Sequence, residues 1–119
     1  MSYKFESHDL ALWSPSNVVG NLFLSQLKNL ADLVDVDSGF RETMGSVFEI
    51  NPKQLDIFLS ATSKYLNNSN NPSLKAFLRP VVIHLLALCS RCDCLSSATL
   101  FDNDMIAESE LLAEKGMPR

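Results

Sequence analysis

The stretch 71–94, NPSLKAFLRPVVIHLLALCSRCDC, is the most apolar part of the chain and decides the fold. Asn71-Pro72 favours a helix start, because an asparagine side chain caps a first turn well and proline suits the first helical position. Apolar residues then recur at helical spacing and cover most of the circumference. We therefore predict a central core helix over 72–92, around which the other elements pack. Its apolar residues are Leu74, Phe77, Leu78, Val81, Val82, Ile83, Leu85, Leu86, Ala87 and Leu88.

Pro80 lies inside this pattern. Because proline removes a backbone hydrogen bond and crowds the carbonyl of Ala76, we expect a kink near Pro80. The alternative is two short helices, over 72–79 and 80–92. The unbroken apolar run is about ten residues long and includes His84, whereas a membrane span needs roughly 20 residues. The sequence therefore favours a core helix over a membrane helix.

Three further helices are predicted around this segment. One, over about 16–35, has Ser14 or Ser16 as its cap, and a second begins at Asn51-Pro52. The last runs over about 104–115, with Asp102 or Asp104 as its cap. Helical spacing places an apolar stripe on each of them. These stripes include Val19, Leu22, Phe23, Leu27, Leu30, Leu55, Phe58, Leu59, Thr62, Leu66, Met105, Ile106, Leu111 and Leu112.

Short strands are predicted near the N-terminus and near residue 50. Residues 3–7 and 10–13 have the pattern of a hairpin, and 47–50 is a strand that can pair with it. Gly39 is expected to supply a left-handed conformation after the first helix, 41–46 is rich in turn formers, and 95–101 is ambiguous between loop and strand.

The predicted fold class is α+β and mainly helical. It has about four helices, organised around the central apolar helix 72–92, which is kinked near Pro80. The N-terminal hairpin and the strand 47–50 add a small antiparallel sheet. A chain of 119 residues has the usual size of one domain, so we expect a single domain over 1–119.

Trp13, Tyr3, Phe5 and Phe48 form an aromatic group within these strands. One interpretation is an exposed anchor for a partner, because Trp and Tyr dominate binding hot spots. The other is a cover between the sheet and the helices. We favour the second, because large aromatic side chains are mostly buried.

Composition places the chain among ordinary globular proteins, with 46% hydrophobic and 20% charged residues. The opening MSYKFESHDL lacks the apolar core of a secretory signal, which predicts a cytoplasmic protein. Cys89, Cys92 and Cys94 are an odd number of cysteines and do not suit the disulfide framework of a secreted domain. We therefore expect reduced thiols.

The charges are distributed unevenly along the chain. Residues 1–92 hold eight acids and eight bases, whereas 93–119 hold six acids and two bases. An acidic surface of this kind repels phosphate backbones and attracts a basic partner. We predict partner binding through these acids, with no direct nucleic-acid binding and no membrane binding. The candidate partner-binding residues are Asp93, Asp102, Asp104, Glu108, Glu110 and Glu114.

No catalytic pattern stands out in the sequence. His84 with the three cysteines forms a conceivable metal set, but C-x2-C-x-C is not one of the paired spacings of zinc sites, and buried thiols at a helix end are the favoured interpretation. Nucleophilic catalysis needs a histidine within reach of Ser or Cys, and the chain has only His8 and His84. We predict no cofactor, no metal and no enzymatic activity.

The segment WSPSNVVG at 13–20, followed by Leu22, Phe23, Gln26 and Leu30-Ala31, resembles the opening of a family of small uncharacterised bacterial proteins. That resemblance brings no catalytic residues with it. In size, acidity and lack of catalytic motifs the chain is also similar to bacterial immunity proteins, which neutralise a cognate toxin by covering its active site.

Two hypotheses follow from different classes of protein. The first is a cytoplasmic immunity or antitoxin protein whose acidic C-terminal part covers a basic toxin, most simply a nuclease, since a nuclease cleft is positive. The second is a structural adaptor or homo-oligomer that meets a second copy through an apolar helix or the hairpin edge. A small enzyme, the third possibility, needs a pocket that joins His8 or His84 to a carboxylate.

Overall fold

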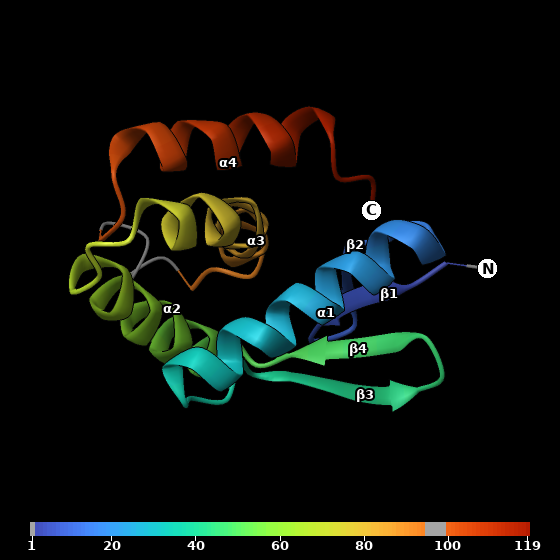
Figure 1. Cartoon of the computed structure of the whole chain (residues 1–119). Helices are drawn as coiled ribbons and strands as arrows, with labels where there is room; N and C mark the ends of the chain where they lie inside the picture. Colours follow the sequence, from blue (N-terminus) through green and yellow to red (C-terminus); the bar gives the residue numbers. More distant parts are fainter. Residues whose placement is uncertain (1, 95–99) are drawn as a thin grey trace.

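The structure, a computed structural model, describes residues 2–94 and 100–119. Figure 1 shows a helical layer beside a small sheet, with α4 along the outside of the helices and α1 across the strands. The α+β, mainly helical fold is confirmed. The described elements, in chain order, are β1 (Lys4–Ser7), β2 (Leu10–Trp13), α1 (Asn17–Val34), β3 (Phe40–Met44), β4 (Val47–Ile50), α2 (Pro52–Asn67), α3 (Pro72–Arg91) and α4 (Asn103–Lys115).

The central helix is α3, which contacts each of the other three described helices. Asn71 caps it through its side-chain oxygen, which accepts hydrogen bonds from the backbone of Ser73 and Leu74. It is one helix and not two, although Pro80 lies inside it. In Figure 1 the first turns of α3 are seen from the side and the later turns nearly end-on, so its axis bends as expected.

The two halves of α3 differ in burial. From Leu78 to Cys89 nearly every side chain is buried, as the apolar pattern predicts. Phe77, predicted on the same apolar face, is instead 76% exposed, and that prediction was wrong. The first turns of α3 project beyond the core, so helical spacing alone did not distinguish a buried face from one that extends past its neighbours.

By length and composition alone, α3 is apolar enough to cross a membrane. The sequence estimate counted only the unbroken apolar run of about ten residues, whereas the whole helix has 20 residues. Half of its most apolar window is buried inside the structure. The buried core helix of a globular protein meets the same criterion, so this property is weak evidence for a membrane helix.

The sheet has four strands in the order β2-β1-β4-β3. Strands β1 and β2 form the predicted hairpin, and β4 pairs with β1, as expected. That pairing is parallel, with Phe5 opposite Phe48, so the sheet is mixed and the prediction of a wholly antiparallel sheet was wrong. Strand β3 was not predicted, and its residues 41–44 had been assigned to a turn-rich segment.

The aromatic group lies between the sheet and the helices, as favoured from the sequence. Phe5 is fully buried and Trp13 is 2% exposed, and their rings stack with centroids 5.4 Å apart. The ring of Phe23 from α1 meets both edge-on, at 5.4 Å and 5.2 Å. The sheet and α1 therefore share one aromatic core.

Side-chain caps define where the helices begin. Of the alternatives left open by the sequence, Ser16 caps α1 and Asp102 caps α4. Gly39 is left-handed as predicted, with φ 85°, but it precedes β3 and does not end the helix. Helix α1 ends at Asp35, which is itself left-handed with φ 57°. The ambiguous segment 95–101 lies outside the described residues except for Leu100 and Phe101.

Candidate functional site

Helix α4 carries five of the six predicted acids at or within its ends. Met105 and Ser109 face inward and are buried, and the opposite side of the helix is open to solvent. All six acids are exposed, as a partner-binding surface requires, but they do not form one set. Asp93 lies at the end of α3 in a left-handed conformation with φ 61°, on a different element from the other five.

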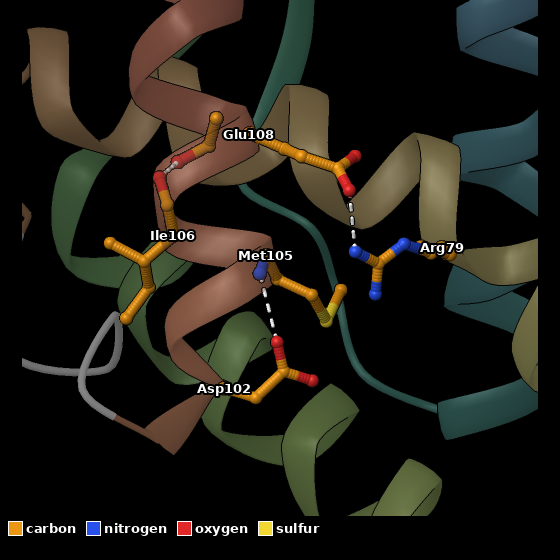
Figure 2. Close-up of polar contacts among 6 residues, drawn as sticks. Arg79, Asp102, Met105, Ile106 and Glu108 are labelled. Carbon is orange, nitrogen blue, oxygen red and sulfur yellow. Dashed lines mark hydrogen bonds and ion pairs between the residues drawn. The ribbon is translucent and has the colours of Figure 1, made fainter.

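Two of the acids on α4 already have structural roles. The carboxylate of Asp102 accepts a hydrogen bond from the backbone of Met105 at 2.8 Å and so caps the helix. Glu108 forms an ion pair with Arg79 of α3 at 2.7 Å, and both contacts are visible in Figure 2. The hydrogen bond with Glu108 raises the pKa of Arg79. These two carboxylates therefore stabilise the position of α4.

The remaining acids of α4 are Asp104, Glu110 and Glu114. Among residues 2–94 and 100–119, none of the three takes part in an ion pair. At about 100° per residue, Glu110 and Glu114 lie one above the other on α4. Leu111, beside these acids on α4, is 55% exposed. The sequence had placed it on a buried apolar stripe, and that prediction was wrong. We call Asp104, Glu110, Leu111 and Glu114 the α4 surface.

A groove of about 580 Å³ lies between α3 and α4 and shares Leu111 with the α4 surface. Its lining is mainly apolar, with a few charged side chains at the rim. The lining residues are Arg79, Pro80, Ile83, His84, Glu108, Leu111, Leu112, Lys115 and Gly116.

A second, smaller groove of about 190 Å³ opens between α1 and α3, where Val19 and Leu22 are 44% and 62% exposed although their stripe was predicted to be buried. Pro80 and His84 line both grooves. His84 is half-buried, and its Nδ1 lies 2.8 Å from the carbonyl oxygen of Pro80.

His84 packs on the aromatic core, with ring centroids 5.4 Å from Trp13 and 6.1 Å from Phe23. The other histidine, His8, is exposed in the turn between β1 and β2. The described part of the chain contains no group of three or more His, Cys, Asp or Glu residues placed to hold a metal ion. The alternative metal set of His84 with the three cysteines is therefore not assembled.

The cysteines differ from the sequence prediction. Cys89 and Cys94 form a disulfide, with their Cα atoms 5.0 Å apart, so the prediction of reduced thiols was wrong for this pair. Cys92 is a free thiol, with its Sγ 3.7 Å from that of Cys94. Burial is the main cause that raises the pKa of Cys92 from 9.0 to about 11.

This pKa predicts slow alkylation of Cys92. Since the thiolate is the nucleophile, a pKa higher by two units lowers its fraction about 100-fold near neutral pH. We expect iodoacetamide to modify native protein about 100-fold more slowly than urea-unfolded protein. Mass spectrometry of the peptide that contains Cys92 measures both rates. Equal rates in the two states would contradict the buried thiol.

Contacts at the end of α3 hold α4 in place, and sequence analysis missed them. The Arg91 guanidinium donates to the backbone carbonyls of Leu12 in β2 and Ala113 in α4. Burial lowers the pKa of Arg91. A basic residue in the last turn of a helix is common, so the sequence did not mark Arg91 as special. Its partners Leu12 and Ala113 lie 79 and 22 residues away along the chain.

Residues after α4 return to the strands, as the C-terminus in Figure 1 shows. Met117 is 2% exposed. The backbone N–H of Ser14 donates to the carbonyl oxygen of Pro118 at 2.8 Å. The Ser14 hydroxyl donates to the backbone oxygen of Arg119, also at 2.8 Å. The α4 surface is therefore fixed at both ends of its helix.

Comparison with known proteins places the chain at the level of a family. Residues 1–119 match the family model described as a family of unknown function, DUF6086. The chain belongs to this family. Membership of an uncharacterised family, which the sequence predicted, is thus confirmed over the whole chain. No curated protein and no solved structure matches the chain.

Proposed function

We propose that this protein is a cytoplasmic immunity or antitoxin protein that binds a cognate bacterial toxin, a nuclease, through the α4 surface. The observation that supports this proposal is the exposure of Asp104, Glu110 and Glu114 around the exposed Leu111. The acids supply charge complementarity to a positive cleft, and the leucine supplies apolar contact area.

The arrangement on α4 suits electrostatic steering. A nuclease cleft is positive because it holds phosphates, so carboxylates on a helix face can occupy it and speed association. Asp102 contributes to the same negative field while also capping the helix, whereas the charge of Glu108 is balanced by Arg79. Asp93 lies on another element and is not included in the proposed contact.

Charge reversal at Glu110 and Glu114 tests the proposal. We expect Glu110→Lys/Glu114→Lys to lower the association rate constant at least about tenfold, because steering raises association rates about 10- to 1,000-fold. The partner to test is the product of the reading frame beside the gene, by surface plasmon resonance and by growth on co-expression. Lysine near a helix C-terminus is favourable, so the variant should fold.

A matched control is Asp32→Lys/Glu42→Lys, which changes the net charge equally at exposed acids of α1 and β3. This control should retain most of the association rate and full protection. If both double variants associate alike, net charge and not the α4 surface controls binding. Undiminished binding and protection by the α4 variant would exclude this mechanism.

A second candidate, from another class, is a structural adaptor or homo-oligomer without enzymatic activity. Exposed apolar side chains favour it: Val18 at 70%, Leu22 at 62% and Phe77 at 76% exposed lie on α1 and α3. Light scattering after size exclusion separates the two proposals. A dimer that Leu22→Asp or Phe77→Asp dissociates supports the adaptor, and a monomer supports the immunity protein.

A further inference from the structure

The groove between α3 and α4 combines an apolar floor with a positively charged rim. Its volume, about 580 Å³, lies in the range of roughly 300–1,000 Å³ that is typical of small-molecule sites. Such sites are mostly apolar, with a few polar groups that fix the orientation of the ligand. The floor is formed by Pro80, Ile83, Leu111 and Leu112.

The charged groups of the groove do not cancel. Arg79 and Glu108 neutralise one another through their ion pair at 2.7 Å. Lys115 lines the groove as well and, among residues 2–94 and 100–119, forms no ion pair. The groove therefore has one unmatched positive charge, on a protein with a formal net charge of −4.

The remaining polar side chain of the groove is His84, and the acids of the α4 surface are not part of the lining. A cationic ligand would meet Lys115 with no free carboxylate to offset it. An anionic head group can instead pair with the ammonium group of Lys115, while a hydrocarbon chain packs on the apolar floor. Charge complementarity thus selects an amphipathic anion.

We propose that this groove binds a small amphipathic carboxylate, with its head at Lys115 and its aliphatic chain along the floor between α3 and α4. This site shares Leu111 with the α4 surface, but its head group lies at Lys115, whereas the charged groups of the toxin contact are Asp104, Glu110 and Glu114. Charge variants at Lys115 and at Glu110 and Glu114 therefore test the two proposals separately.

Decanoate below its micellar concentration is the probe. Isothermal titration calorimetry on the whole chain should show saturable binding of one decanoate per protein. Fluorescence provides a second measurement, because Trp13 is the only tryptophan and its ring lies 5.4 Å from that of His84, which lines the groove. Bound decanoate should change the emission of Trp13 along the same binding curve.

Variants at Lys115 test the head-group contact. Lys115→Gln should weaken decanoate binding about tenfold, since a hydrogen bond to a charged group contributes about that factor. Lys115→Arg keeps the charge and should bind within about twofold of the native protein. Lys75→Gln is the matched control, because Lys75 is exposed on α3 but does not line this groove.

A change of ligand tests the charge preference. Decyltrimethylammonium has the same chain with a positive head and should bind at least about tenfold more weakly than decanoate. Acetate, which lacks the chain, should not bind detectably. Equal binding of the cation, an unchanged affinity in Lys115→Gln, or no saturation in either measurement would overturn the proposal.

Discussion

Replacement of Phe5 by alanine is expected to lower the free energy of unfolding by about 3–5 kcal/mol. The Phe5 side chain is fully buried and its ring meets those of Trp13, Phe23, Phe40 and Phe48 at centroid distances of 5.4 Å to 5.8 Å. The deletion removes the residue that joins three strands to α1, and neighbouring rings are too rigid to fill the cavity.

Phe77→Ala is the matched control for this prediction. It deletes the same atoms at a position that is 76% exposed, where surface substitutions change stability by about 0.5 kcal/mol or less. Urea unfolding of both variants under one redox condition gives the two free energies. A loss below about 1 kcal/mol for Phe5→Ala would show that the aromatic core is not packed as described.

Gly20→Ala is expected to destabilise the protein by about 1–2 kcal/mol, contrary to helix propensity. In most helix interiors alanine is about 1 kcal/mol more favourable than glycine. At Gly20 an added Cβ would overlap the ring of Tyr3, lying 2.8 Å from its Cγ and 2.9 Å from its Cε2. Overpacking of this kind costs about 1–3 kcal/mol and outweighs the propensity gain.

The same substitution should change sign when the ring is absent. In a Tyr3→Ala background, Gly20→Ala should stabilise the protein by up to about 1 kcal/mol, because only the propensity difference remains. Thermal or urea unfolding of the four variants gives the coupling energy between the two positions. An additive cycle, with no sign change, would show that Tyr3 does not cover Gly20.

Local sequence signals predicted the helices well, because capping and apolar spacing act within a few residues. Ser16, Asn51, Asn71 and Asp102 each accept a backbone hydrogen bond at the start of a helix. Four residues of the segment at 13–20 have structural roles: Trp13 and Pro15 are buried, Ser16 caps α1, and Gly20 contacts Tyr3.

The sheet was harder to predict because its pairing is not local. Strand β3 is exposed along Arg41 to Met44 and has no apolar alternation, so its pairing with β4 defines it as a strand. The parallel alignment of β1 with β4 joins segments more than 40 residues apart, such as Phe5 and Phe48. Nothing in either segment indicates its direction relative to the other.

The candidate site was predicted only in part for the same reason. The acids are exposed, as charge patterning indicated, but the partner of Glu108 is Arg79, 29 residues away. The groove between α3 and α4 depends on that contact between helices, and no local pattern marks it. Leu111 matched the apolar spacing of α4 yet is 55% exposed, since α3, the main neighbour of α4, covers only part of that stripe.

The attachment of α4 at both ends has a consequence for the thermodynamics of association. Asp102 and the buried Phe101 hold its start, and Met117 with the two hydrogen bonds from Ser14 holds its end. Binding normally costs conformational entropy when a segment is ordered at the interface. A partner that binds the outer face of α4 meets a helix that is already ordered, so more of the contact free energy contributes to affinity.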